Sequence, residues 1–141
     1  MTKSYLLGID IGTSACKVAV FDRNGQVLAA ANGDYPVYYP QEGWAEQNPE
    51  EWWSAVCKAT KETIQKAGIA PEEIAGVGID GQSWSAIAIA KAGKVLTNTP
   101  IWMDTRAQSI CDRLNEEIGA DKIFEVAGNS LQPSYTTAKI I

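Results

Sequence analysis

Apolar and polar positions alternate along the first 31 residues in a way that predicts three β-strands. These strands are expected over about residues 4–11, 15–22 and 26–31. Arg23-Asn24-Gly25 separates the second strand from the third, and Asn-Gly is a strong signal for a tight hairpin turn. Residues 34–47 are rich in Pro, Tyr and Gly without any period, so an ordered surface loop is expected there.

A helical period follows this loop. Asn48 is suited to the N-cap, Pro49 fits the first turn and Glu51 completes a capping box. Gly68 is placed to end the helix. The residues predicted to face the core recur at helical spacing and are Trp53, Val56, Cys57, Thr60, Ile64 and Ala67.

The second half of the chain predicts further strands and helices. Ile74–Ile79 is a continuous apolar run, as in a strand buried on both faces, and residues 84–90 form another predicted strand before a turn at 91–94. Asp104 or Thr105 is suited to cap a helix that Gly119 would end. The inward face of that helix is predicted to consist of Ala107, Ile110, Cys111, Leu114 and Ile118.

The order of these elements predicts the fold class. Three strands in hairpin order, followed by helix, strand and helix, are typical of an α/β ribonuclease H-like domain, which has a mixed β-sheet with flanking helices. This is the ATPase-type fold of sugar kinases, actin and Hsp70. A last helix begins near residue 134 and has no C-cap before Ile141, so the chain is interpreted as a truncated first domain.

A polar turn between the first two predicted strands carries the strongest candidate chemistry. Asp10 closes the first strand, where a carboxylate can order the water shell of Mg²⁺. Gly12, Thr13 and Ser14 offer backbone N–H groups and hydroxyls to phosphate oxygens, and Lys17 adds a positive charge. An ordinary hairpin with a glycine turn is the alternative interpretation.

Composition excludes several function classes. A net charge of −5 without a basic cluster argues against nucleic-acid binding. The absence of histidine excludes Ser-His-Asp and Cys-His nucleophiles and His-containing zinc sites within this chain. The sequence contains neither a Walker A motif nor a Gly-x-Gly-x-x-Gly motif between a strand and a helix. Cys16, Cys57 and Cys111 are expected as buried free thiols, and with no membrane-spanning run they predict a cytoplasmic protein.

Four segments together resemble a known family. The polar turn, Gly43–Trp53, Gly78–Gln82 and Ile101–Ala107 are similar in order and spacing to the N-terminal domain of the FGGY carbohydrate kinases, with xylulokinases most alike. The resemblance covers nearly the whole chain and implies that residues 1–141 are the N-terminal part of the first kinase domain. It also implies that the general-base Asp and the nucleotide-binding second domain lie beyond Ile141. The chain alone is therefore expected to be inactive.

The resemblance implies a role for each residue of the polar turn. Asp10 would help hold Mg²⁺. Gly12, Thr13, Ser14 and Lys17 would face the transferred phosphate of ATP. Phosphoryl transfer depends mainly on positioning and charge neutralisation, so these groups are chemically suitable.

The same resemblance implies a sugar-binding wall made of Gln82, Ser83, Trp84, Trp102 and Asp104. Xylulokinases usually have Met and His where this chain has Ser83 and Trp84, which removes an imidazole and adds an indole. Core packing is the alternative for both tryptophans, and helix capping is the alternative for Asp104. Structural roles are expected for the family landmarks Trp44, Glu46 and Gln47.

The implied reaction is transfer of the γ-phosphate of MgATP to a hydroxyl of a pentulose, with xylulose favoured. Ribulose, glycerol, erythritol and gluconate are alternative acceptors, because Ser83 and Trp84 depart from the xylulokinase pattern. An actin-like or Hsp70-like ATPase domain without a sugar substrate, or a non-catalytic sugar-binding module, are further alternatives. Small molecules, and neither nucleic acid nor membrane, are the expected partners, and a homodimer of the full-length protein stays open.

Overall fold

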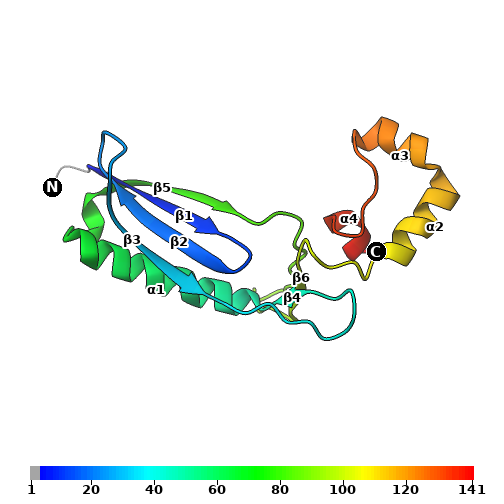
Figure 1. Ribbon diagram of the computed structural model, residues 1–141, viewed down its shortest axis with the longest axis horizontal. Coiled ribbons are helices and arrows are strands. Elements are labelled where there is room, and N and C mark those ends of the chain that lie inside the picture. The colour runs from blue at the N-terminus through cyan, green and yellow to red at the C-terminus, as the bar shows by residue number, and fades with distance from the viewer. Residues whose placement is uncertain (1–3) are drawn as a thin grey trace. The chain divides into compact units, whose positions relative to one another are not determined.

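The computed structural model describes residues 4–141, which form two compact units (Figure 1). The described residues up to Pro36, together with Glu50–Gln82, form the first unit. Val37–Pro49 and Ser83–Ile141 form the second. No helix within residues 4–141 combines the length and the apolarity needed to cross a membrane.

A four-stranded mixed sheet forms the centre of the first unit. Its strand order is β3-β2-β1-β5, with β5 parallel to β1 and the other pairs antiparallel. The three predicted N-terminal strands are confirmed, and β3 extends three residues further than expected because its pairing with β2 continues as far as Asp34. The strand bounds are Tyr5–Ile11 for β1, Ala15–Phe21 for β2, Val27–Asp34 for β3 and Ile74–Gly81 for β5.

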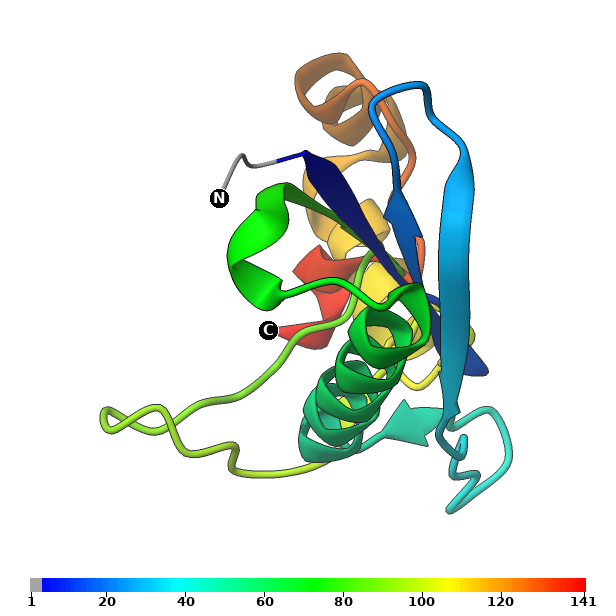
Figure 2. The same ribbon diagram turned by 90° about the vertical axis from the view of Figure 1, so that its left-hand side faces the viewer.

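Helix α1 (Pro49–Ala67) lies alongside one face of this sheet, as Figure 2 shows. Alternate residues of the strands point towards it and are buried: Leu7, Ile9, Cys16, Val18, Val20 and Ala31. The Thr63 hydroxyl lies 3.3 Å from the Val18 carbonyl oxygen to which it donates, which ties the helix to the central strands. The predicted helix bounds are confirmed, since α1 begins after Asn48 and ends before Gly68. A short 3₁₀ turn η1 (Pro71–Glu73) then leads into β5.

The predicted inward face of α1 is confirmed at Val56 and is wrong at Trp53 and Cys57, which are exposed. The buried residues are Trp52, Ala55, Val56, Ala59 and Thr63, whereas Trp53 is 67% exposed. The side of α1 that carries small residues faces the sheet, because α1 approaches the backbone of β3 closely at Gly33. Cys57, predicted as buried, is exposed for the same reason, while Cys16 and Cys111 are buried as expected.

The predicted apolar stripe of α1 instead lines a groove beside β5. Trp53, Val56, Cys57, Thr60 and Ile64 lie on one side of it, and Val77 and Ile79 are among the residues that line it from the sheet. The expectation that Ile74–Ile79 is buried on both faces is therefore wrong for this chain. Strand β5 is the edge of the sheet, so Val77 and Ile79 are 56% and 70% exposed.

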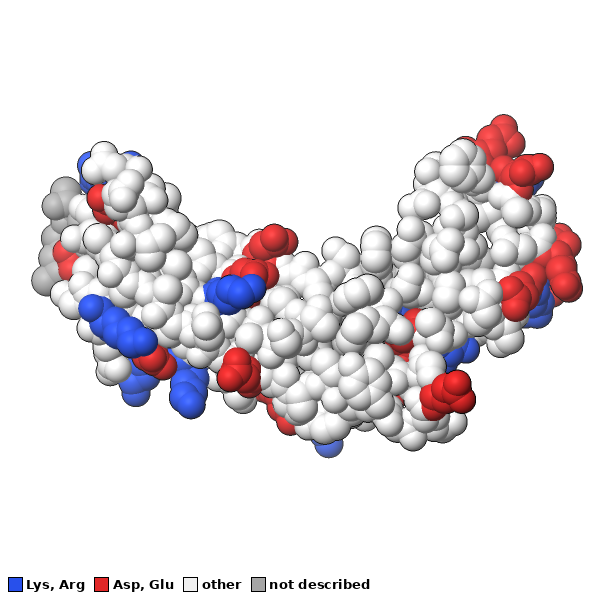
Figure 3. All heavy atoms as spheres, in the orientation of Figure 1, with Lys and Arg blue, Asp and Glu red and all other residues white. Residues whose placement is uncertain are grey.

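The second unit combines a short strand pair with three helices. Strand β4 (Glu46–Gln47) pairs antiparallel with β6 (Thr99–Pro100). The helices are α2 (Gln108–Ile118), α3 (Ala120–Ala127) and α4 (Thr136–Lys139), and acidic side chains gather over α2 and α3 (Figure 3). Ala107, Cys111 and Ala138 form a small buried cluster against which Ile110 and Leu131 pack.

Several expectations for this unit need correction. Residues 84–90, all described, form no strand, and only an isolated bridge joins Ile89 to Val95 across the correctly predicted turn. Helix α2 ends at Gly119 as predicted, but Ile118 is 51% exposed rather than inward. Helix α3 was not predicted, because its N-cap is Gly119 and the sequence therefore has no polar capping residue at its start.

We predict that Gly33→Ala destabilises the first unit by about 1–3 kcal/mol. A Cβ atom at this position would lie 2.8 Å from the Ala55 carbonyl oxygen, so the helix would have to move away from β3. Urea unfolding of the two proteins measures the change. Gly78→Ala is the matched control within the same sheet, because no atom lies within 4 Å of its Cβ position. Equal stability of the two variants would contradict the close-approach argument.

Candidate functional site

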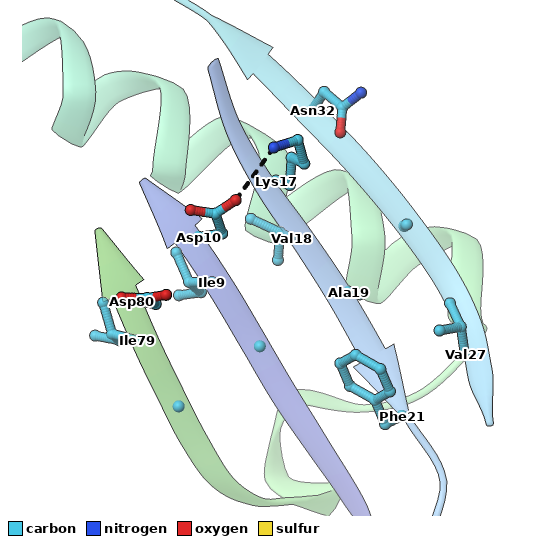
Figure 4. A pocket seen from close by; sticks show the side chains of 13 residues that line it. Ile9, Asp10, Lys17, Val18, Ala19, Phe21, Val27, Asn32, Ile79 and Asp80 are labelled. Carbon is cyan, nitrogen blue, oxygen red and sulfur yellow. Dashed lines mark hydrogen bonds and ion pairs between the residues drawn. The ribbon is translucent and has the colours of Figure 1, made fainter. Parts of the chain in front are cut away.

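A row of polar side chains crosses the face of the sheet opposite α1. Lys17 is the register partner of Asp10 on one side and of Asn32 on the other. Asp10 is in turn the register partner of Asp80 on β5. Because residues paired across strands lie on the same face, Asn32, Lys17, Asp10 and Asp80 stand side by side over all four strands (Figure 4).

These four residues line a cavity of about 670 Å³ on the open face of the sheet. Glycines at positions 8 and 78 keep its floor low, and Phe21 closes one end. The Lys17 ammonium and the Asp10 carboxylate form an ion pair with an Nζ–Oδ2 distance of 3.2 Å, and their side chains are 66% and 47% exposed. An exposed ion pair contributes little to stability, so a ligand with its own charges can replace it.

Backbone and a buried phenol shape the turn between β1 and β2. The Gly12 amide donates to the Ala15 carbonyl over 3.1 Å, and the Gly12 carbonyl accepts a hydrogen bond of 2.5 Å from the Tyr35 hydroxyl. The Tyr35 amide also donates to the Ser14 carbonyl. Burial, with the nearby Cys16 and Asp10, raises the pKa of Tyr35, so the phenol stays protonated as a donor. Tyr35 thereby fixes the carbonyl side of the turn and leaves Thr13 and Ser14 at its tip.

The donor set of this cavity fits a magnesium ion accompanied by phosphate. Mg²⁺ in nucleotide-binding proteins is usually held by one or two carboxylates, substrate phosphates and water. Asp10 and Asp80 supply two carboxylates at neighbouring register positions. Among residues 4–141 no group of three or more Asp, Glu, Cys or His residues is placed to hold a metal ion alone. Two carboxylates leave coordination positions that phosphate oxygens and water can fill.

We predict that Tyr35→Phe loosens this turn without unfolding the sheet. The variant removes one hydrogen bond to Gly12, which is worth about 1 kcal/mol, and retains the buried ring. Hydrogen exchange of the amides at residues 12–15 should become faster, while the amides of α1 stay protected. Tyr39→Phe is the control, since Tyr39 is 67% exposed. Unchanged exchange in the turn would show that Tyr35 does not fix it.

The segment that follows β5 contains three of the residues predicted to contact the sugar, namely Gln82, Ser83 and Trp84. The Gln82 amide donates to the Ile11 carbonyl over 2.9 Å, which joins this segment to the end of β1 within the first unit. Ser83 and Trp84 begin the second part of the second unit. Trp84 is 46% exposed and Trp102 is 44% exposed, so core packing, the alternative interpretation, fits neither indole. Their contact with a sugar stays a prediction.

Asp104 is the centre of a buried ion-pair network in the second unit. Its side chain is fully buried, and its two oxygens accept hydrogen bonds from the Arg106 guanidinium at 2.7–3.0 Å. The Ala45 amide donates to the same carboxylate over 2.7 Å. Arg106 also pairs with Glu46 at 2.7 Å and lies 3.6 Å above the ring of Trp44. These contacts join residues 44–46 to residues 104–106.

The expected helix cap at Asp104 or Thr105 is wrong, and the structural roles expected for Trp44 and Glu46 agree with this network. Helix α2 begins at Gln108 with Ala107 as its N-cap and without a side-chain cap, so Asp104 and Thr105 do not cap it. The structural roles expected for Trp44 and Glu46 are confirmed by their contacts with Arg106, and Gln47 is fully buried. The contact of Asp104 with a sugar stays a prediction.

We predict that Asp104→Asn destabilises the second unit by about 2 kcal/mol at neutral pH, because it leaves Arg106 without its main counter-charge. Burial raises the pKa of Asp104, but hydrogen bonds from Arg106 and Ala45 outweigh it and leave the pKa lowered. The stabilisation is therefore present above the unfolded carboxyl pKa of about 3.9 and is lost as the pH falls below it.

Urea unfolding at pH 7 and pH 3 tests this prediction. The original chain should lose more stability than the Asp104→Asn variant between the two pH values, because other carboxyls cancel in the comparison. The same loss in both chains would contradict the role of the Asp104 carboxylate.

Sequence reasoning missed five residues of these arrangements. Asn32 joins the polar row only through strand register, and no motif contains it. Asp80 lies in the segment Gly78–Gln82 that resembles the family, but its place beside Asp10 depends on strand register. Tyr35, Arg106 and Lys139 act through long-range hydrogen bonds. Asp10 and Lys17 follow buried residues in alternating strands, and this alternation could have predicted that both side chains lie on the open face of the sheet.

Comparisons with known proteins agree with this geometry. Residues 5–141 match the model of the N-terminal domain of the FGGY family of carbohydrate kinases. The glycerol kinase of Methylibium petroleiphilum is 34% identical over 138 residues, which are 97% of this chain and 28% of that protein.

Solved structures of carbohydrate kinases are also similar to this chain. A xyloylose kinase from Brucella ovis matches with a TM-score of 0.87 and 29% identity over 96% of this chain and 28% of its own. A gluconate kinase from Lactobacillus acidophilus matches with a TM-score of 0.87 and 29% identity over 96% of this chain and 27% of its own. These likenesses confirm the predicted ribonuclease H-like fold.

Proposed function

Because this chain belongs to the FGGY family of carbohydrate kinases, we propose that it is the N-terminal part of an ATP-dependent kinase that phosphorylates a hydroxyl group of a sugar or polyol. The chain spans about 28% of the length of the curated relatives it matches, so the activity proposed is that of the full-length protein. The observation that carries the proposal is the polar row Asn32–Lys17–Asp10–Asp80 beside the turn at Gly12–Ser14.

The polar row suits the phosphate side of such a reaction. Asp10, supported by Asp80, would hold Mg²⁺, which supplies charge neutralisation of the transferred phosphate when bound. Lys17 is free to turn from Asp10 to a phosphate oxygen, because the ion pair is exposed. Thr13 and Ser14 would donate backbone and hydroxyl hydrogen bonds to the same group, whereas the Gly12 amide already donates to the Ala15 carbonyl. The general base stays predicted beyond Ile141.

Xylulose is the proposed acceptor, and glycerol is the second candidate. Xylulose is supported by the order of the family segments and by the likeness to a xyloylose kinase structure. Glycerol is favoured by a specific observation, namely the 34% identity with a glycerol kinase over nearly the whole chain. Ser83 and Trp84 differ from the xylulokinase pattern, so the acceptor must be decided by assay.

Sugar-dependent ADP formation by the full-length protein tests this function. We predict turnover with xylulose and weaker turnover with glycerol, ribulose, erythritol or gluconate, measured in the presence of MgATP. ATP hydrolysis that is independent of any sugar would instead support an actin-like or Hsp70-like ATPase. Binding of a sugar without any phosphorylation would support a binding module.

The same assay tests the role of Asp10. We predict that Asp10→Asn lowers kcat on the order of 10²-fold, because the cation loses one of its two proposed carboxylate ligands, while sugar affinity measured without nucleotide is unchanged. Asp121→Asn is the matched control, since it removes one negative charge from the exposed first turn of α3. An equal loss of sugar affinity would place Asp10 in the acceptor site.

A further inference from the structure

Tyr35 reaches the turn between β1 and β2 from the α1 side of the sheet. It follows the last residue of β3, and it is 7% exposed. It lines a small hollow together with Ser54 and Ala55 of α1. The polar row lies on the opposite face of the sheet (Figure 4). The turn thus has a buried phenol on one side and the polar row on the other.

Two hydrogen bonds join Tyr35 to this turn, and carbonyl oxygens accept both of them. The Tyr35 hydroxyl donates to the Gly12 carbonyl over 2.5 Å, and the Tyr35 amide donates to the Ser14 carbonyl over 3.4 Å. Burial raises the pKa of Tyr35, so the hydroxyl keeps the proton that it donates. The negative ends of two peptide units are therefore held on the α1 side.

The direction of these carbonyls also sets the direction of an amide. A peptide unit is planar and trans, so its carbonyl and its amide point in opposite directions. The Gly12 carbonyl and the Thr13 amide belong to one such unit. Because Tyr35 holds the carbonyl on the α1 side, the amide is turned towards the side of the polar row. Backbone amides in a turn attract anions, whereas a carbonyl oxygen in the same place would repel a phosphate.

We propose that Tyr35 is a positioning residue for phosphoryl transfer, because it holds the Gly12 carbonyl away from the transferred phosphate and aims the Thr13 amide towards it. The proposal rests on the proposed function, which places a phosphate beside the polar row. Tyr35 contacts the turn rather than the reacting groups, so it acts through the backbone. A donor that is already oriented stabilises the charge of a transition state more effectively than one that must first reorient.

Tyr35→Phe in the full-length protein tests the proposal, because this variant retains the buried ring and removes the hydroxyl. The assay uses MgATP with xylulose or glycerol, whichever supports turnover. We expect kcat to fall about tenfold, because the peptide unit is no longer held, and KM for the acceptor to change by about twofold or less. An unchanged kcat, or a loss that appears only in KM for the acceptor, would overturn the proposal.

Thr63→Val is the matched control for a loss of stability. It also removes a buried hydroxyl from the first unit, since the Thr63 hydroxyl donates to the Val18 and Ala59 carbonyls, and it leaves the turn unchanged. The two variants should show similar decreases in melting temperature, but kcat should fall only in Tyr35→Phe. An equal fall of kcat in both variants would reduce the role of Tyr35 to stability and overturn the proposal.

Binding of a non-hydrolysable MgATP analogue gives a readout that needs no turnover. In the original full-length protein, the analogue should slow hydrogen exchange of the amides at residues 12–15 on the order of tenfold. The protection should be clearly weaker in Tyr35→Phe, while the amides of α1 should exchange alike in both proteins. Equal protection of the turn in the two proteins, or no protection in the original protein, would overturn the proposal.

The two readouts separate this proposal from the proposed function. Phosphorylation of an acceptor with the same kcat in Tyr35→Phe and in the original protein would remove the role of Tyr35 and leave the kinase function. Protection of the turn that requires the Tyr35 hydroxyl, in a protein that phosphorylates no acceptor, would leave the positioning of the turn towards phosphate and remove the kinase function.

Discussion

The pairing of β1 with a strand on each side is the constraint on which the first unit depends. β1 pairs antiparallel with β2 and parallel with β5, so its register fixes which side chains face α1. Leu7 and Ile9 are buried under the helix, and Asp10 falls on the opposite face. A shift by one residue would reverse both faces. The hydrophobic core and the polar row are therefore two consequences of one register.

The second unit depends on polar interactions to a greater degree. Its buried apolar cluster is small, while Arg106 joins Asp104 and Glu46 across about 60 residues of sequence. Such a network is stabilising only when every charge has its partner, which the bidentate contacts with Asp104 provide. Lys139 adds further polar contacts to this unit, since its ammonium donates hydrogen bonds to the carbonyls of Trp84 and Ile101.

Local sequence signals were sufficient to predict several helices and strands and to identify the family. Asn24-Gly25 fixes the hairpin between β2 and β3, because few residues other than glycine adopt the positive φ of 78° found there. Asn48 and Gly68 bound α1 correctly, since caps act on the backbone next to them. The phosphate turn at Asp10 could likewise be proposed from the sequence, because its candidate groups are neighbours in the chain.

Tertiary packing decided what those signals could not. Apolar periodicity placed Trp53 inward, but the close approach of α1 to Gly33 requires small residues and turns Trp53 outward. Asp80 joins Asp10 only through the parallel pairing of β5 with β1, across about 70 residues of chain. Trp84, whose φ is 67°, contacts Tyr135 and Lys139, which lie far along the sequence. The sequence thus determined local backbone conformation and the candidate chemistry, whereas burial and the grouping of side chains depended on non-local contacts that no single segment contains.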